Sequence, residues 1–346
     1  MLHGIGEGLL RTDPACPTVG CMLETQLVCK VTGADSVNHT DKGFAVYGTD
    51  LGILWDGGDG RVFALFGDTF GEGWGGEGGG PNSADWRSNV LGFSTTRDLA
   101  QGMTLDSFVP RADGMAAQVI ARDPRRDEVT VIPNSGIAID GVHYAHYMSV
   151  REWGPPGYWH TNYAGIAVSD DGGTTWVKPQ GARWINRAER DDPFQMCAFA
   201  RDRDHMYLFG TTNGRHGDAY LARAAIPEML NASAYEYYTA RGWTRDEFAA
   251  EPVLRGPVGE LSVAYNVHWG RWLAMHLDDP GGAILLHSAE RLEGPWSPGE
   301  IAVPGRHYPG LYGGYLHPWA PDGSDIYYLM SQWGPYNVFL MRTTVS

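Results

Sequence analysis

The fold is first indicated by residues 47–70, YGTDLGILWDGGDGRVFALFGDTF. Two runs of β-forming residues, 51–55 and 61–66, flank a short segment of glycine and aspartate, DGGDG, at 56–60. Two such runs on either side of a glycine-rich turn are typical of a β-hairpin. We therefore predict an antiparallel pair of strands joined by a tight turn.

Two aspartates, Asp50 and Asp68, stand just outside the two runs. If the turn is centred near Gly58, Asp50 lies opposite Phe66, and Asp68 lies one diagonal step away on the same face. Acid/base hydrolysis of a glycosidic bond requires such a pair of carboxyl groups, and a diagonal spacing favours the inverting form of the reaction. The alternative is that both aspartates only cap backbone amides of the turns. The pattern leaves open which aspartate would be the acid.

The composition favours short strands and disfavours several classes of partner. Of the 346 residues, 47 are glycine, 43% are hydrophobic and 12% are aromatic, which indicates many short strands and tight turns around a full core. The formal net charge is −15, whereas proteins that bind nucleic acids or anionic membrane surfaces usually carry the opposite charge. The sequence also has no run of about 18 apolar residues. We therefore expect neither a nucleic-acid partner nor insertion into a membrane.

Five sets of strand-like segments follow one another, beginning near residues 44, 131, 194, 260 and 312. Repeats of this length without long helices indicate a radial array of small sheets. We therefore predict an all-β fold, a five-bladed β-propeller with short helical insertions. A β-sandwich with insertions would leave five similar meanders unexplained.

The predicted propeller is a single domain over residues 38–346, and residues 1–37 are predicted to be an irregular lead-in. Within the lead-in, residues 23–31 could form one strand. The first residues lack the basic and apolar regions of a secretory signal. Action outside the cell would then depend on a signal outside this sequence, on a phage particle or on release by lysis.

In a propeller, the innermost strand of each blade begins near one mouth of the central channel, so residues at these positions converge there. Besides the aspartate pair, the residues expected to bind substrate or to tune the pKa of the pair are Glu260, Asn134, Ser135, Asp192, Tyr312, Tyr315, His317 and Trp74. Trp74 lies in a glycine-rich loop that could cover a sugar, and aromatic rings pack well against the apolar faces of sugars. For each of these residues, core packing or turn support is the alternative. The histidines do not have metal-ligand spacing, so we predict no metal site and no cofactor.

The segment SDDGGTTW at 169–176 fits the Asp-box pattern S-x-D-x-G-x-T-W. In this motif the aspartate, here Asp171, accepts hydrogen bonds from backbone amides and the tryptophan packs beneath the turn. Asp boxes usually lie on the periphery of propellers, so we expect a structural role.

Four stretches carry a family resemblance: TDLGILWDGGDGRVFALFGDTF at 49–70, PNSGIAIDG at 133–141, AFARDRDHMYLFGTTNGR at 198–215 and GELSVAYN at 259–266. Together they resemble glycoside hydrolase family 183, the endo-D-arabinanases, first catalogued as domain of unknown function 4185. The resemblance covers about residues 38–346 and is most specific in the TDLG…GDTF pair. It implies a five-bladed propeller in which Asp50 and Asp68 are the essential aspartates. Members of the family occur in actinobacteria and their phages.

The resemblance implies an endo-acting glycoside hydrolase. Its substrate would be the internal α-D-arabinofuranosyl linkages of D-arabinan, in mycobacterial arabinogalactan and lipoarabinomannan. A non-catalytic carbohydrate-binding propeller, such as a phage module that attaches to the cell envelope, is the alternative, although binding alone does not require a carboxylate pair. A sialidase fits less well, because only one good Asp box occurs and because a net negative charge disfavours an anionic substrate.

Overall fold

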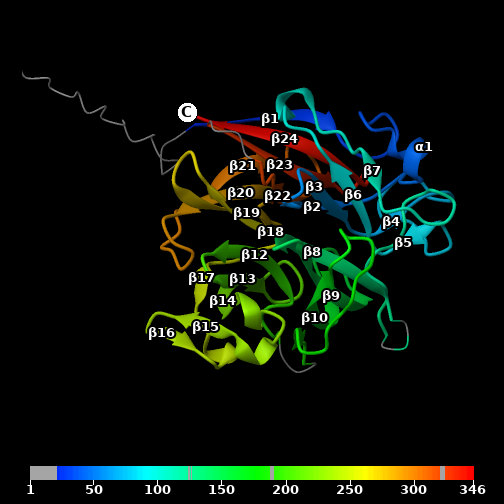
Figure 1. The fold of residues 1–346 in the computed structure, drawn as a ribbon. Coiled ribbons are helices and arrows are strands. Elements are labelled where there is room, and N and C mark those ends of the chain that lie inside the picture. Colours follow the sequence, from blue (N-terminus) through cyan, green and yellow to red (C-terminus); the bar gives the residue numbers. More distant parts are fainter. Residues whose placement is uncertain (1–21, 124, 126, 188–190, 320–323) are drawn as a thin grey trace, which may run out of the picture.

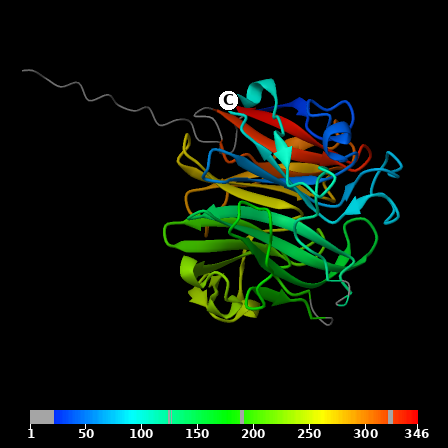
Figure 2. The same ribbon diagram turned by 45° about the vertical axis from the view of Figure 1, so that its right-hand side comes forward.

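The structure is a computed structural model that describes residues 22–123, 125, 127–187, 191–319 and 324–346. Over this part of the chain, five antiparallel sheets are arranged as a five-bladed β-propeller (Figures 1 and 2). The innermost strands of consecutive blades contact one another, and the innermost strand of the fifth blade contacts that of the first. This closed ring confirms the predicted fold.

Each blade is a meander whose innermost strand comes first in the chain. Blade 5 differs among the described blades because its outermost strand, β1, comes from the other end of the described chain. Blade 1 contains β2 (Leu51–Asp56), β3 (Val62–Phe66), β6 (Val90–Ser94) and β7 (Ser107–Phe108). Blade 2 contains β8 (Thr130–Ile139), β9 (Val142–Trp153), β10 (Trp159–Ser169) and β11 (Arg183–Ile185). Blade 3 contains β12 (Met196–Asp202), β13 (His205–Thr211) and β14 (Ala219–Ala225), with β15 (Glu236–Thr239), β16 (Gly242–Thr244) and β17 (Pro252–Leu254) outside them. Blade 4 contains β18 (Leu261–Asn266), β19 (Arg271–Asp278), β20 (Ala283–Ala289) and β21 (Glu300–Pro304). Blade 5 contains β22 (Leu311–Leu316), β23 (Asp325–Gln332), β24 (Asn337–Val345) and β1 (Leu23–Lys30).

The first strand of the described chain closes the ring. β1 pairs antiparallel with β24, so that Leu23 lies opposite Val345 (Figure 1, blue beside red). The one strand expected in the lead-in is therefore the outermost strand of blade 5, and the propeller extends beyond the predicted boundary at residue 38. The rest of the predicted lead-in up to residue 21 lies outside the described residues.

Helical elements are short and lie outside the sheets. They are α1 (Thr40–Phe44) and the 3₁₀ turns η1 (Leu99–Gln101), η3 (Ile226–Glu228), η4 (Ala232–Ala234) and η5 (Glu247–Ala249). A two-stranded ribbon of β4 (Thr69–Phe70) and β5 (Trp86–Arg87) extends from blade 1. Within the described residues, no helix is long and apolar enough to cross a membrane.

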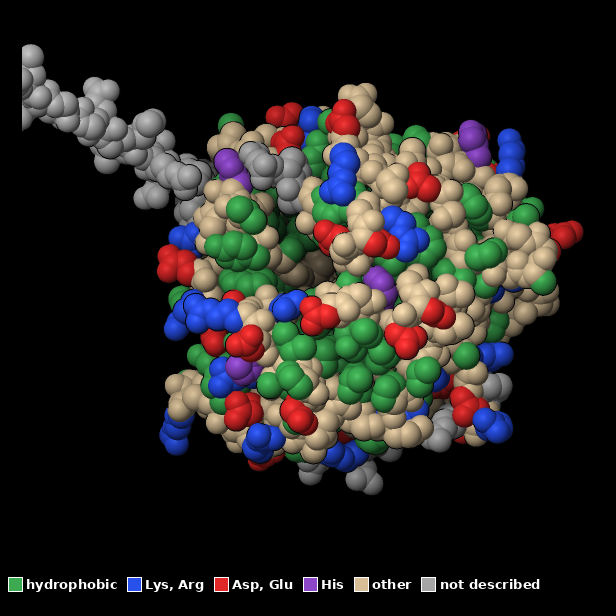
Figure 3. All heavy atoms as spheres, in the orientation of Figure 1, with side chains coloured by type: hydrophobic (Ala, Val, Ile, Leu, Met, Phe, Trp, Pro, Cys, Tyr) green, Lys and Arg blue, Asp and Glu red, His purple; other side chains and the backbone are tan. Residues whose placement is uncertain are grey.

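The middle strands of blade 1 are buried along their whole length. β3, with the sequence VFALF, has no exposed residue because neighbouring blades cover both of its faces. The outermost strand β1 instead alternates between exposed and partly buried residues. On the surface, acidic and basic side chains are interspersed over one face, which is hollowed near its centre (Figure 3).

The predicted register of the β2–β3 hairpin is wrong. Trp55 pairs with Phe63, so the turn is centred one residue later than expected. A bulge at Gly52 then shifts the pairing by one residue, and the carbonyl of Asp50 accepts a hydrogen bond from the amide of Gly67 instead of facing Phe66. An added residue in one strand has this effect on every position beyond it.

Candidate active site

One end of the ring collects the polar side chains, and we call it the mouth. All five innermost strands begin there, and because the second strands run antiparallel to them, the loops between second and third strands return to the same end. Asp50 directly precedes β2, and Glu260 directly precedes β18. Asp68 follows β3, and Tyr312 is the second residue of β22. The structure therefore brings together polar groups from blades 1, 4 and 5.

The bulge that shifts the register also shapes the position of Asp50. Leu51 and Gly52 both have positive φ, 66° and 83°, which is uncommon for a leucine. The amide of Leu51 donates to the hydroxyl of Ser331 at 2.8 Å, which ties this strained backbone to blade 5. Non-glycine residues in such conformations persist only where the surroundings hold them.

The carboxyl group of Asp50 faces the mouth in partly buried surroundings. Its Oδ2 accepts a hydrogen bond from the hydroxyl of Tyr312 at 3.0 Å, while Oδ1 is buried and has no hydrogen-bond partner of good geometry among the described residues. Burial is the main cause that raises the pKa of Asp50 to about 8, and the charges of Asp68 and Glu260 raise it further. Hydrogen bonds from Tyr312 and Tyr336 oppose this shift.

Asp68 has a different set of partners. Its Oδ1 accepts hydrogen bonds from the hydroxyl of Thr130 at 2.7 Å and from the indole nitrogen of Trp86 at 3.0 Å. Pairing of β4 with β5 sets Trp86 opposite Phe70, close to the aspartate. Burial raises the pKa of Asp68 to about 6, and the two hydrogen bonds and the charge of Arg122 limit the rise. Because an indole N–H can only donate, these contacts favour the ionised carboxylate.

The two carboxyl groups are therefore unlike. Near neutral pH, Asp50 holds its proton and Asp68 is largely ionised, since the pKa of Asp50 is about 8 and that of Asp68 about 6. Pairs of carboxyl groups whose pKa values are pushed apart by their surroundings can act as acid and base in one reaction.

A third carboxylate, Glu260, is held by Arg215. The guanidinium group of Arg215 donates to Oε1 of Glu260 at 2.7 Å and to Oδ1 of Asp279 at 3.1 Å. It also lies between two aromatic rings, 5.3 Å from the centroid of Tyr312 and 5.8 Å from that of Trp159. Oε2 of Glu260 is buried without a partner among the described residues. The glutamate thus adds negative charge next to Asp50 while its own position is fixed by Arg215.

Asn134, Ser135 and Tyr315 lie deeper than the mouth. Asn134 and Tyr315 line a cavity of about 10 Å³ together with Glu260. The amide of Asn134 also contacts the ring of His146 at 3.2 Å. The hydroxyl of Ser135 accepts a hydrogen bond from the amide of Phe199, so it connects blade 2 to blade 3. These residues support the floor of the site.

Three other predicted residues make structural contacts that do not involve the carboxyl groups of Asp50 and Asp68. Oδ2 of Asp192 accepts a hydrogen bond from the amide of Arg187 at 2.7 Å. The indole of Trp74 donates to the carbonyl of Gly78 at 3.0 Å and so fixes its own loop. The prediction that His317 lies at the mouth is wrong, because His317 follows the far end of β22, where the charge of Asp56 acts on it.

Sequence reasoning missed Thr130, Trp86, Tyr336 and Arg215. Thr130 and Trp86 are 62 and 18 residues from Asp68 in the chain, and no local sequence pattern predicts that either residue contacts Asp68. Arg215 ends one of the stretches that carry the family resemblance, but its position beside Glu260 depends on how blades 3 and 4 meet. In the described residues, no group of three or more metal-ligating side chains comes together.

The Asp box forms the expected turn. Asp171 accepts hydrogen bonds from the amide and hydroxyl of Thr175 at 2.9 and 2.7 Å, and the indole of Trp176 donates to the carbonyl of Gly173 at 2.9 Å. The turn connects β10 to β11, at the end of blade 2 opposite the mouth.

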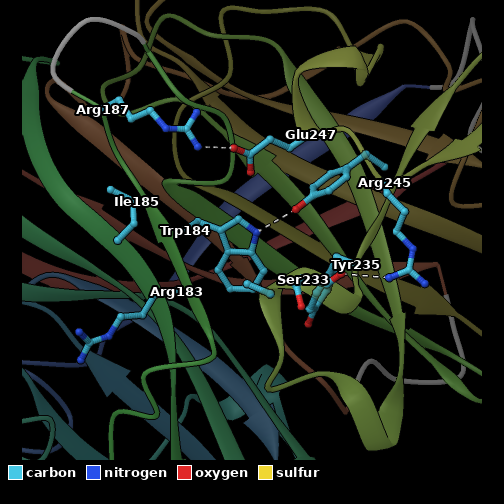
Figure 4. Close-up of a pocket in the computed structure, with 10 residues that line it drawn as sticks. Arg183, Trp184, Ile185, Arg187, Ser233, Tyr235, Arg245 and Glu247 are labelled. Atoms are coloured by element: carbon cyan, nitrogen blue, oxygen red, sulfur yellow. Dashed lines mark hydrogen bonds and ion pairs between the residues drawn. The ribbon is translucent and has the colours of Figure 1, made fainter.

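A recess of about 270 Å³ lies on the perimeter of the ring, between β11 of blade 2 and the outer elements of blade 3. Trp184 donates to the hydroxyl of Tyr237 at 3.3 Å, and Arg187 pairs with Glu247 at 3.0 Å (Figure 4). Because its walls come from outermost elements, this recess is separate from the carboxyl pair.

Comparison with known proteins places the chain in a family. The DUF4185 family, described as a domain of unknown function, matches residues 35–342. The chain belongs to the DUF4185 family. Notoamide biosynthesis cluster protein J of Aspergillus sp. (strain MF297-2) is 32% identical over 96% of this chain and 90% of that protein. Notoamide biosynthesis cluster protein J' of Aspergillus versicolor is 29% identical over 96% of this chain and 92% of that protein.

Solved structures with the same fold are more distant in sequence. A putative hydrolase from Bacteroides ovatus has a TM-score of 0.59 at 15% identity, covering 88% of this chain and 87% of that one. A family 117 glycoside hydrolase of Zobellia galactanivorans has a TM-score of 0.54 at 14% identity, covering 94% and 90%. At this level of identity, the likeness of this DUF4185 protein to them establishes the fold alone.

Proposed function

We propose that this protein is an endo-acting glycoside hydrolase that cleaves internal α-D-arabinofuranosyl linkages of D-arabinan, with Asp50 as general acid and Asp68 as general base. The observation that carries the proposal is the pair of carboxyl groups at the mouth with unlike partners, Tyr312 on Asp50 and both Thr130 and Trp86 on Asp68. The propeller fold, which it has in common with a family 117 glycoside hydrolase, supports a glycosidase. The choice of arabinan rests on the family resemblance of the sequence.

In the proposed reaction, Asp50 donates its proton to the oxygen that leaves the anomeric carbon. Asp68 accepts a proton from a water molecule as that water attacks the same carbon from the opposite face. The new reducing end carries the oxygen of the water, and the proton returns from Asp68 to Asp50 through solvent. The sequence predicted inversion from a diagonal pairing of the two aspartates, which the hairpin does not have. Inversion is therefore a separate hypothesis. NMR tests it by showing which anomer of the product is formed first.

The test is release of arabino-oligosaccharides from purified arabinogalactan. Wild-type protein should release a ladder of fragments, and Asp50→Asn and Asp68→Asn should each lower the rate by about 10²–10⁴-fold, the usual contribution of an acid or base. Asp56→Asn is the matched control, because Asp56 ends the same strand at the opposite face of the ring, where it bonds Gly58 and Trp319. Activity that persists in both mouth variants would disprove the assignment of the pair.

Other outcomes separate the alternatives. Binding of the polymer without any release would favour the carbohydrate-binding propeller, and release of single arabinose units alone would contradict endo action. The proposed site of action is a polysaccharide of the cell envelope, outside the cell. If mycobacterial cells treated with the added protein lose no arabinan, that location is wrong.

A second candidate is hydrolysis of a small molecule, favoured by the similarity to a notoamide biosynthesis cluster protein over nearly the whole chain. Incubation of purified notoamides with wild-type protein and with Asp50→Asn, followed by mass spectrometry, tests it. A mass change produced by the wild type alone would support this candidate. Unchanged notoamides together with cleaved arabinan would reject it.

A further inference from the structure

An exposed tyrosine projects from blade 2 at the mouth. Tyr158 lies in the loop between β9 and β10 and keeps 54% of its surface exposed. Its ring stacks on that of His216, with centroids 3.9 Å apart and planes at 26°. The loop is a tight turn in which the amide of Gly154 donates to the carbonyl of Tyr158 and the amide of Tyr158 donates to that of Pro155. The ring is therefore held in place before any ligand arrives.

A series of contacts connects the loop of Tyr158 to Asp50. The carbonyl of Gly157, next to Tyr158, accepts hydrogen bonds from the amide of Arg215 at 3.0 Å and from the His216 ring at 2.9 Å. Arg215 contacts the ring of Tyr312, whose hydroxyl bonds Asp50. The exposed ring and the acid thus belong to one connected network.

A matching tryptophan projects from blade 5. Trp333 follows β23 directly, at the mouth, and is 56% exposed. Its ring meets that of Tyr336 edge-on, with centroids 5.6 Å apart, and Tyr336 hydrogen-bonds Asp50. Gly78 in the glycine-rich loop lies so close that an added Cβ would be 3.2 Å from the indole. The indole ring of Trp333 therefore packs against Tyr336 and the glycine-rich loop on one side and is open to solvent on the other.

We propose that Tyr158 and Trp333 are distal sugar-binding subsites on either side of the Asp50–Asp68 pair. The inference rests on the proposed function. The Tyr158 loop is connected to Asp50 through Arg215 and Tyr312, and Trp333 is connected to it through Tyr336, so the two rings approach the pair from different blades. Rigid, half-exposed aromatic rings bind the apolar faces of sugar rings at little cost in conformational entropy. Sugars bound on both sides of the cleaved bond are what internal cleavage of a chain requires.

The experiment compares Tyr158→Ala and Trp333→Ala with Tyr265→Ala as matched control. Tyr265 is 49% exposed but lies near the far end of β18, away from the mouth. Each mouth variant should raise KM for long arabinan by about five- to tenfold, with kcat within about twofold, since it removes binding that is equal in ground and transition states. An aryl arabinofuranoside, too short to reach either ring, should be hydrolysed at an unchanged rate. Tyr158→Phe should restore the wild-type KM, because it keeps the ring.

Binding is measured separately by affinity electrophoresis in arabinogalactan gels, with each variant combined with Asp50→Asn. If the wild type cleaves arabinan and both mouth variants behave like Tyr265→Ala, the subsites are wrong while the proposed function stands. If nothing is cleaved but retardation in the gel still depends on Tyr158 and Trp333, the function is wrong and the subsites stand. If the protein does not bind the polymer at all, the subsite proposal is overturned.

Discussion

At the level of single residues, the two aspartates at the mouth lie in unlike surroundings. Oδ2 of Asp50 accepts a hydrogen bond from Tyr312 and its buried Oδ1 has no partner of good geometry among the described residues, whereas Oδ1 of Asp68 accepts two hydrogen bonds. The first arrangement suits a protonated acid and the second an ionised base.

We predict a bell-shaped dependence of kcat/KM on pH. Activity should fall below about pH 6 as Asp68 takes up a proton, and above about pH 8 as Asp50 loses its proton. The measurement is the initial rate of arabinan cleavage across this range. A rate that keeps rising above pH 9, about one unit beyond the pKa of Asp50, would contradict the assignment of the acid.

Trp86→Phe should move the acidic limb of that profile to higher pH. The substitution keeps an aromatic ring but removes the N–H that donates to Asp68, so the ionised form of Asp68 loses a stabilising hydrogen bond and its pKa rises. The alkaline limb should not move, since Trp86 makes no hydrogen bond to Asp50. An unchanged acidic limb would mean that Asp68 does not set it.

Asp50→Asn should stabilise the fold while it lowers activity. Because the folded-state pKa of Asp50, about 8, lies above the unfolded value of roughly 3.9, the folded protein binds this proton more tightly. Its free energy of unfolding therefore falls as pH rises from about 4 to about 8, and an asparagine does not titrate. The Tm of the variant should exceed that of the wild type, by a margin that grows between pH 5 and pH 8. An equal Tm at both values would contradict the raised pKa.

The two aspartates were predictable from the sequence, but their roles were not. GTD and GDT flank two β-type runs, which places both aspartates at one end of the hairpin, although the diagonal pairing predicted for them was wrong. The partners that distinguish the roles, such as Tyr312 and Thr130, are 262 and 62 residues away in the chain. His317 was misplaced because the end of the ring on which a residue lies depends on where its strand stops.

Among the secondary-structure elements, the hairpin of β2 and β3 positions Asp50 through glycines. The sequence predicted that this hairpin exists, but it did not predict the pairing register of its strands. The bulge at Gly52 that sets the register is indicated in the sequence only by a single glycine. That glycine also faces blade 5, where a Cβ would lie 2.8 Å from Leu329. The bulge therefore reflects packing between blades, which local pattern does not encode.

Gly67→Ala should impair catalysis more than folding. A Cβ at this position would meet Oδ1 of Asp50, so the carboxyl group must move aside. A displacement of about 1 Å can lower kcat by about 10²-fold. Gly43→Ala is the matched control, because nothing lies near its added Cβ. Wild-type kcat in Gly67→Ala would show that the position of Oδ1 does not matter.

At the scale of the whole molecule, the ring is closed by strands from both ends of the described chain. The five repeats predicted the propeller. They did not predict that β1 completes blade 5, because nothing in the sequence LETQLVCK indicates that it pairs with β24. The hydroxyls of Thr25 and Thr343, 2.6 Å apart, are one of the contacts that join the two strands.

Removal of the chain before Val31 should therefore destabilise the protein. β24 would become an exposed edge strand, and the side chains that pack on β1 would lose their cover. We expect a Tm lower by at least several degrees and aggregation on size-exclusion chromatography. An unchanged Tm and a monodisperse peak would contradict closure by β1.

Hydrolysis in water enriched in oxygen-18 is the decisive test of acid/base cleavage by Asp50 and Asp68. Arabinogalactan is digested briefly, and the released fragments are analysed by mass spectrometry. Wild-type protein and Asp56→Asn should release arabino-oligosaccharides that each carry one solvent-derived oxygen at the new reducing end, and Asp50→Asn and Asp68→Asn should release almost none. Unlabelled fragments, or equal release by all four proteins, would contradict hydrolysis by this pair of aspartates.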